Sequence, residues 1–251
     1  MSSEFLDSYI ENSASDIEET VPELLQKVDF DTAIELSFYY RQNASCQYLL
    51  TGNTTAFVDN MHRSAGSFLY FLQTSKEQDK RTSENEPYFD AIVGGFMKTV
   101  GQMAKYSRSS CNFDYEYEDD FLYTHFLLSY FFREADGQKI LSDYEAVLEG
   151  DDDVRFDLCK SFFEKDPDMF NDKFEQFLVE RDENMIKMIS RETVGEDIWS
   201  WSKYISMEGL ALLKLASLLN FKTNTNYKQI PEGLRYLPET EFNSNLWQSI
   251  S

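Results

Sequence analysis

Histidine is scarce in this chain, since only His62 and His125 occur among its 251 residues. A di-iron carboxylate bundle needs two Glu-x-x-His pairs on facing helices. Asp59 and His62 match half of that pattern, but Leu122 stands three residues before His125. The sequence therefore argues against such a metal centre. We expect His125, which shares a helical row with aromatic residues and leucine, to be a hydrogen-bonded core residue.

Cysteine is nearly as rare. Cys46, Cys111 and Cys159 are odd in number, far apart and without a C-x-x-C pair, which excludes a disulfide framework and a zinc ribbon. The sequence also lacks H-E-x-x-H, G-x-S-x-G, P-loop and Rossmann motifs. We therefore expect no catalytic residues, no metal site and no cofactor.

Long apolar runs are missing as well. The stretch FLYTHFLLSYFF at 121–132 has 12 residues with polar interruptions, whereas a membrane span needs roughly 18 apolar residues. The first residues show neither a signal peptide nor an Arg-rich transit peptide. We expect a cytoplasmic protein with no membrane partner.

Only 10 glycines and 5 prolines punctuate the chain, and apolar residues recur mostly at spacings of three and four, which is typical of helices. The sequence predicts an all-α fold of roughly 8–10 antiparallel helices, forming a bundle or a short solenoid-like single domain over 1–251. The charged loop at 74–86 would separate two possible sub-halves, 1–74 and 87–251.

Local signals place individual helices. Polar clusters at 13–16 and 20–23 predict a short first element. Asp166 and Pro167 predict a helix start, with a buried stripe at Phe170, Phe174, Phe177, Leu178, Met185 and Met188. Further helices are expected at 28–50, at 54–73, at 87–107 after Pro87, and at 204–220, which is apolar almost all round. Glu208 lies in this last helix, and we expect it to meet a basic partner or helix-end N–H groups if it is buried, because an unpaired buried charge is costly.

The chain is rich in acidic residues, with 45 aspartates and glutamates against 23 lysines and arginines. The net charge is −22, and residues 114–183 hold 22 acidic against 7 basic side chains, while residues 1–40 hold 10 against 1. Aromatic residues make up 16% of the chain, so the acid belongs to a folded body and not to a disordered tail. Such a surface would repel nucleic acid and anionic membranes and attract a basic protein.

Three acidic clusters, at 114–120, 149–157 and 164–175, precede expected helices. Helix dipoles account for two or three of these carboxylates, and solvated helix ends remain an alternative explanation for the rest. If these helix starts lie at the same end of an up-down helix array, the three clusters would form one negative surface. Tyrosines within it could act as interface anchors. The predicted partner-binding residues are Asp114, Tyr115, Glu116, Tyr117, Glu118, Asp119, Asp120, Asp151, Asp152 and Asp153.

Residues 34–72 contain a Tyr-Arg helix, a Gly-Asn turn and a small-residue helix, and residues 199–238 contain a Ser-Met-Glu-Gly-Leu-Ala helix leading to a proline-terminated segment. Together these stretches resemble the bacterial immunity protein 49 family of polymorphic toxin systems. The apolar helix and the proline-containing segment also resemble the immunity proteins of PoNe-type DNases. Both resemblances imply a helical protein that binds a cognate toxin domain and blocks it. Neither supplies a motif that marks binding residues.

A nuclease fits such a role best, because enzymes that bind a phosphate backbone are basic. We therefore expect stoichiometric occlusion of a cytoplasm-acting nuclease toxin, without catalysis. Two alternatives stay open at the level of sequence. One is a helical scaffold or adaptor that binds a peptide or a basic host protein, and the other is an enzyme that uses carboxylates with Mg²⁺.

Overall fold

A computed structural model describes residues 3–133 and 136–249, and all regular elements in these ranges are helical. The main helices are α1 (Ser3–Gln26), α2 (Phe30–Thr51), α3 (Thr54–Thr74), α4 (Glu86–Val93), α5 (Met97–Tyr106), α6 (Glu118–Phe132), α7 (Gly137–Leu148), α8 (Val154–Glu164), α9 (Pro167–Ser190), α10 (Glu196–Ser202), α11 (Met207–Leu218) and α12 (Glu232–Arg235). Single 3₁₀ turns are η1 (Glu77–Asp79) and η2 (Leu246–Gln248). The predicted all-α class is confirmed. No helix in the described part of the chain is long and apolar enough to cross a membrane.

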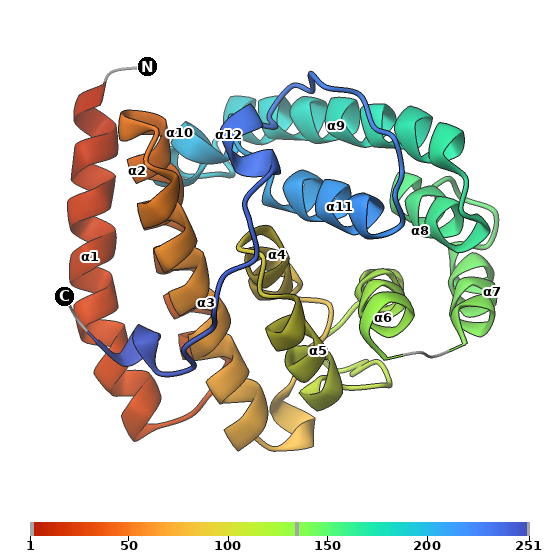
Figure 1. Cartoon of the computed structure of the whole chain (residues 1–251). Helices are drawn as coiled ribbons and strands as arrows, with labels where there is room; N and C mark the ends of the chain where they lie inside the picture. The colour runs from red at the N-terminus through yellow and green to blue at the C-terminus, as the bar shows by residue number, and fades with distance from the viewer. Residues whose placement is uncertain (1–2, 134–135, 250–251) are drawn as a thin grey trace.

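Helices α1, α2 and α3 lie side by side at one end of the molecule (Figure 1). Asp29 caps α2 by accepting a hydrogen bond from the Thr32 N–H, and α2 ends at Gly52, whose φ of 70° closes the helix. Asn53 then caps α3. The prediction of a helix end at this Gly-Asn turn is confirmed. The prediction of a short first element is wrong, because α1 is a single 24-residue helix that continues through Pro22.

The segment 87–107 forms two helices and not the single helix that was expected. Helix α4 ends before Gly94, and α5 begins at Met97. Gly95 has a φ of +83°, and a Cβ at this position would lie 2.8 Å from the Pro238 carbonyl oxygen. The helix is interrupted at this point, where the C-terminal strap, residues 236–249, packs against Gly95.

The C-terminal strap returns from α12 and runs beside α3 to reach α1 (Figure 1). Trp247 is buried, and its carbonyl oxygen accepts a hydrogen bond from the Tyr40 hydroxyl at 2.8 Å. The backbone N–H of Asn243 donates to His62 Nε2 at 2.7 Å. Most of the buried hydrophobic residues in the described part of the chain, among them Val21 and Trp247, belong to one core cluster. Leu6, Cys46 and Trp201 form a second, small cluster.

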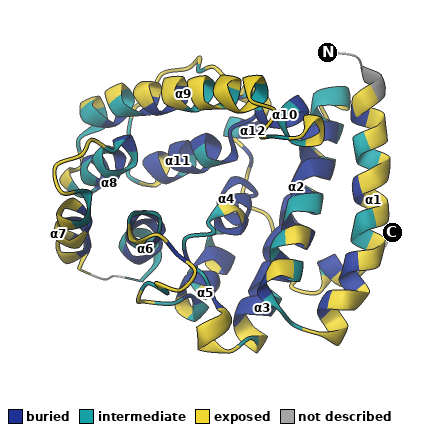
Figure 2. Cartoon of the chain, turned by 180° about the vertical axis from the view of Figure 1, so that it is seen from behind, coloured by how far each residue is buried: buried dark blue, intermediate teal, exposed yellow. Residues whose placement is uncertain are grey.

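Helices α4 and α11 lie at the centre of this core (Figure 2). Helix α11 matches the expected central helix, and α9 starts at the predicted Asp166 cap. Phe170, Phe174, Phe177 and Leu178 form the predicted buried stripe of α9. The stripe prediction is wrong at its far end, where Met185 is half-buried and Met188 is exposed. Both methionines line a cavity instead of packing into the core.

Candidate protein-binding site

The predicted acidic cluster at 114–120 falls in a turn between α5 and α6 and in the first turn of α6. We call residues 112–120 the acidic–aromatic segment. Three of its aromatic side chains project into solvent, with exposed fractions of 73% for Phe113, 63% for Tyr115 and 80% for Tyr117. Asp114 and Glu118 are also exposed. Aromatic rings of this size usually bury much of their surface, so three exposed rings on one turn make this segment a candidate interaction site.

Glu116 differs from its neighbours because it is only 8% exposed. One carboxylate oxygen accepts a hydrogen bond from the Ser83 backbone N–H at 2.7 Å, and the other accepts one from the Asn112 backbone N–H at 2.8 Å. Glu116 therefore anchors the turn to the loop at 74–86. Its carboxylate has a structural role and is not available to a partner. This differs from the sequence-based prediction, which assigned Glu116 to the partner-binding residues.

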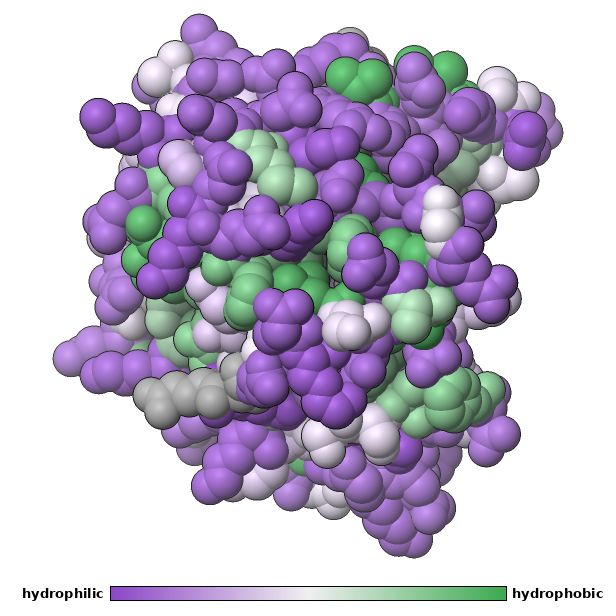
Figure 3. All heavy atoms as spheres, turned by 90° about the vertical axis from the view of Figure 1, so that its right-hand side faces the viewer, coloured by the Kyte–Doolittle hydropathy of each residue, from purple (hydrophilic) through white to green (hydrophobic). Residues whose placement is uncertain are grey.

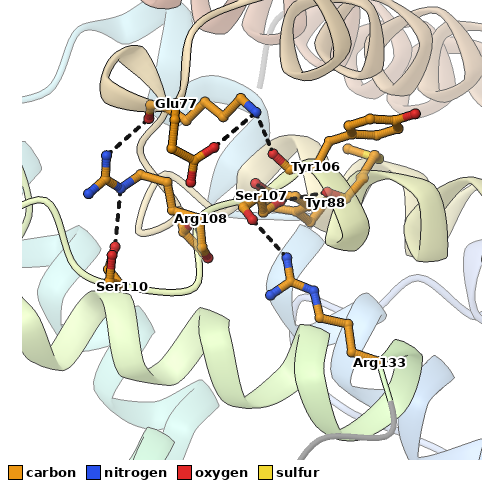
Figure 4. A network of polar contacts seen from close by, with 10 residues as sticks. Glu77, Tyr88, Tyr106, Ser107, Arg108, Ser110 and Arg133 are labelled. Atoms are coloured by element: carbon orange, nitrogen blue, oxygen red, sulfur yellow. Dashed lines mark hydrogen bonds and ion pairs between the residues drawn. The ribbon is translucent and has the colours of Figure 1, made fainter.

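A network of polar contacts supports the base of this segment (Figure 4). The buried Lys80 donates to the Tyr106 carbonyl oxygen at 2.8 Å and lies 3.2 Å from the Glu77 carboxylate. Arg108 donates to the Glu77 carbonyl oxygen at 3.0 Å and to the Ser110 carbonyl oxygen at 3.1 Å. These bonds join the loop at 74–86 to the chain that leads into the acidic–aromatic segment.

Two further contacts hold Ser107, where that chain leaves α5 (Figure 4). The Arg133 guanidinium at the end of α6 donates to the Ser107 carbonyl oxygen at 3.0 Å. The hydroxyls of Ser107 and Tyr88 lie 2.7 Å apart, and burial raises the pKa of Tyr88. The segment is thus attached at both ends and at Glu116, so its exposed rings stand on a fixed backbone.

Arg81 orients Tyr115. Its guanidinium carbon lies 4.6 Å from the centroid of the Tyr115 ring and 4.3 Å from that of the Phe30 ring. One nitrogen also lies 3.6 Å from the Asp31 carboxylate. Tyr115 therefore keeps one face on a cation and presents the rest to solvent.

Arg155 joins the first two acidic clusters. Its guanidinium lies 2.7 Å from Asp120 and 3.8 Å from Asp119 at the start of α6, and 3.6 Å from Asp153 at the start of α8. Asp153 also caps α8 and accepts a hydrogen bond from the Tyr144 hydroxyl at 2.6 Å. Part of the negative charge is thus balanced within the protein.

Asp151 and Asp152 are exposed in the turn that precedes α8. The third cluster starts at the other end of α8, where Asp166 caps α9. Because α8 has 11 residues, the two ends are about 16 Å apart. The start of the third cluster thus lies away from the first two. Its later part returns beside α8, where Lys173 Nζ lies 2.9 Å from the Asp157 carboxylate of the second cluster.

The acidic–aromatic segment forms a ridge between two hollows. Phe113 lines one hollow of about 820 Å³ together with apolar residues of α6 and α7, including Phe121 and Ile140. Tyr115 lines the other, of about 780 Å³, together with Arg81 and the α1–α2 turn. The side of the molecule that carries α7 shows a band of hydrophobic surface framed by hydrophilic side chains (Figure 3).

His125 lines the first hollow and is half-buried, so it is less enclosed than the expected core histidine. Its ring stacks on Phe121 with centroids 5.1 Å apart, and Nδ1 lies 3.5 Å from the Ser129 hydroxyl. Burial and, second, the charge of Arg133 lower the pKa of His125 to about 4. The imidazole is therefore neutral near pH 7 and adds no positive charge to the hollow.

Among residues 3–133 and 136–249, no group of three or more histidine, cysteine, aspartate or glutamate side chains is arranged to hold a metal ion. The chemical groups that the acidic–aromatic segment exposes are aromatic rings and carboxylates. No family model, curated protein or solved structure matches the chain. The function has to be inferred from the site itself.

Proposed function

We propose that this protein is an immunity protein that binds a cognate bacterial toxin and blocks it by stoichiometric occlusion. The observation that carries the proposal is the acidic–aromatic segment, where three exposed rings stand among carboxylates on an anchored turn. Interface hot spots are rich in tyrosine and cluster where a partner can exclude water from them. Phe113, Tyr115 and Tyr117 have that composition and that clustering.

The fixed backbone under the rings supports tight binding. Ordering a flexible loop at an interface reduces affinity, at about 0.5–1.5 kcal/mol for each immobilised side chain. Glu116, Lys80 and Arg108 already hold this segment in place. The backbone of the segment therefore loses little further freedom when a partner docks, and only the exposed rings still have to be immobilised.

The charge of the surrounding surface points to a basic partner. Asp114, Glu118, Asp151 and Asp152 are exposed, and the 114–183 region carries a large acidic excess. Such a surface accelerates encounter with a basic protein and repels nucleic acid. A cytoplasm-acting nuclease has a basic phosphate-binding surface that this protein would cover.

The test begins with capture of the partner at low salt by the tagged protein from a lysate of the organism that encodes it, followed by purification of both proteins. We expect a basic nuclease whose activity falls to zero at a one-to-one ratio, with an association rate that decreases as NaCl rises. A partner without enzymatic activity, or inhibition only at large excess, would contradict the proposal.

A double variant tests the surface. Tyr115→Ala with Tyr117→Ala should weaken toxin binding by at least about 2 kcal/mol, roughly thirtyfold. Tyr236→Ala is the matched control, because Tyr236 is also an exposed tyrosine but lies on the C-terminal strap. Equal affinity of the double variant and the control for the toxin would place the interface elsewhere.

The hollow beside Phe113 favours a second candidate function, a scaffold that binds a basic peptide. Its floor contains Phe121 and Ile140, and Glu118 and Glu149 lie on its border. A basic amphipathic helix could lay apolar residues on this floor. The purified partner distinguishes the two functions, because a scaffold would bind its partner without inhibiting an activity.

A further inference from the structure

The C-terminal strap crosses α3 without joining its backbone (Figure 1). Backbone-to-backbone hydrogen bonds of the strap stay within it, as in the bond from the Leu246 N–H to the Asn243 carbonyl oxygen at 3.1 Å, and none links it to another described segment. Segments whose backbone bonds do not join them to the core open at a lower free energy than the core does. The strap is therefore the segment that we expect to open while the helices remain folded.

Side chains hold the strap in place of backbone bonds. Those that bond to its backbone come from α2, α3 and α11 and are Tyr40, His62, Arg63 and Lys214. Tyr40, Arg63 and Lys214 donate to strap carbonyl oxygens, whereas His62 accepts an N–H. Histidine is the side chain whose charge ordinarily changes between pH 5 and 8. A change of pH in this range therefore acts on the set of anchors at His62.

The contact of His62 with the strap requires a neutral imidazole. The Asn243 backbone N–H donates to His62 Nε2 at 2.7 Å, so this nitrogen carries a lone pair and the ring proton lies on Nδ1. The Asn243 carbonyl oxygen lies 3.0 Å from the same nitrogen. A proton on Nε2 would point at the Asn243 N–H, and the peptide would have to move before the carbonyl oxygen alone could face the ring. Protonation thus breaks the bond that closes the strap.

The ring of His62 is enclosed by aromatic side chains. His62 is only 6% exposed, and its ring centroid lies 4.4 Å from that of Phe242 in the strap and 4.7 Å from that of Phe96 before α5. Burial lowers the pKa of His62, although the Asn243 backbone opposes this effect. An open strap would expose the ring to water, where a positive charge is solvated.

Charged side chains near the ring come from α3, the start of α5 and the strap, and are Asp59, Arg63, Lys98, Glu239 and Glu241. Asp59 raises the pKa of His62 and Arg63 lowers it, so the two charges on α3 oppose each other. The other three line the hollow beside Phe96 and Phe242 and are exposed to solvent, which weakens their effect. Enclosure of the ring therefore dominates.

We infer that the C-terminal strap is a pH-sensitive latch, closed while neutral His62 accepts the Asn243 N–H and opened when acid protonates His62. The open form takes up a proton that the closed form excludes, so opening becomes more favourable as the pH falls below about 6.5. One linked proton raises the opening equilibrium at most about tenfold for each pH unit. Opening withdraws Trp247, which is 1% exposed, from its seat on α3 beside Gly66.

The experiment is amide hydrogen exchange of the full chain at pH 7.5 and 5.5, followed by mass spectrometry and corrected for the intrinsic exchange rate at each pH. Peptides from residues 236–249 report the strap, and those from 207–218 report α11. We expect the strap to exchange faster than α11 at both pH values, with an opening equilibrium that rises severalfold, and at most about tenfold, at pH 5.5. Equal strap opening at the two pH values, or strap exchange as slow as that of α11, would overturn the inference.

Variants assign the effect to His62. A glutamine amide can accept the Asn243 N–H and donate to its carbonyl oxygen without titrating, so His62→Gln should keep the strap closed at both pH values. It retains the carboxylates of the strap, and any pH dependence that they cause would persist in it. His62→Phe should open the strap more at both pH values, because it keeps a ring but forms neither bond. A strap as pH-dependent in His62→Gln as in the unsubstituted protein would refute the latch.

A second histidine separates local opening from global unfolding. His125→Phe removes the other imidazole of the chain, which lies in α6 and makes no contact with the strap among its hydrogen bonds and ring contacts. This variant should keep the full pH dependence of strap opening. Loss of that dependence in His125→Phe would show that the strap opens only by global unfolding and would overturn the inference. None of these outcomes bears on the acidic–aromatic segment, so the proposed function is tested separately.

Discussion

The Glu116 carboxylate accepts the Ser83 backbone N–H at 2.7 Å and thereby attaches the acidic–aromatic segment to the loop at 74–86. Its other oxygen accepts the Asn112 N–H. Glu116→Ala would leave both donors without this carboxylate, and hydrogen bonds to charged groups are worth about 1.5–3 kcal/mol each. Ser83 and Asn112 are only half-buried, so water replaces part of the two lost bonds, and we expect urea denaturation to show a loss of about 2–4 kcal/mol. Asp114→Ala, at an exposed acid of the same turn, should change stability by less than about 0.5 kcal/mol.

The buried ion pair of Arg41 and Asp90 predicts that replacing one partner lowers the free energy of unfolding more than replacing both. Arg41→Met should cost about 3–5 kcal/mol in unfolding free energy, because the Asp90 carboxylate remains buried without its cation. Adding Asp90→Leu removes that charge and should restore most of the loss. Lys139→Met, which breaks the exposed pair with Asp143, should be indistinguishable from the unsubstituted protein in the same measurement. A double variant no more stable than Arg41→Met would contradict this account.

Replacement by alanine is expected to change stability in opposite directions at Gly95 and Gly101. Gly95→Ala places a Cβ 2.8 Å from the Pro238 carbonyl oxygen at a φ of +83°, and should destabilise the protein by about 1–3 kcal/mol. Gly101 lies inside α5, and a Cβ there would meet nothing within 4 Å. Gly101→Ala should therefore stabilise the protein by about 0.5–1 kcal/mol. Thermal unfolding of both variants distinguishes a strained contact from general intolerance of glycine replacement.

His125 predicts a pH dependence of stability. Burial and Arg133 lower its pKa from 6.5 to about 4 in the folded protein, so between these values the unfolded chain binds a proton that the folded chain does not. The contribution of His125 to stability is thus present above pH 6.5 and decreases as the pH falls towards 4, by at most about 3 kcal/mol. His125→Phe lacks this titration. The stability difference between variant and unsubstituted protein should shift in favour of the variant over that range, and a constant difference would contradict the assignment.

The part of the fold that was predictable depends on short-range signals. The Gly52-Asn53 turn and the Asp166-Pro167 pair act on backbone groups within a few residues, so the helix ends they specify were predicted correctly. Pro22 was misleading, because Val21 and Leu24 are buried in the core and hold α1 together across it. Local propensity is a weak guide where packing on a neighbouring helix opposes it.

The candidate sites were only partly predictable. Composition revealed an acidic region with tyrosines, and the exposed rings of Tyr115 and Tyr117 lie there. The burial of Glu116 could not be predicted, since its partner Ser83 lies in another loop. The role of Arg155 could not be predicted from the sequence either, although its guanidinium joins carboxylates at the starts of α6 and α8.

By itself, the sequence determined the all-helical class, the helix ends at the Gly52-Asn53 turn and at Asp166, and the sign and location of the charge, because these depend on spacing, caps and composition. Only the tertiary structure decided which carboxylates are free. Glu116, Asp120 and Asp153 meet partners inside the protein, whereas Asp114 and Glu118 remain at the surface. The cavity lined by Met185, Met188 and Glu208 likewise exists only because α2 and α4 converge with the sequence-distant helices α9, α10 and α11. Burial and pairing are properties of that convergence, and no local pattern of residues encodes them.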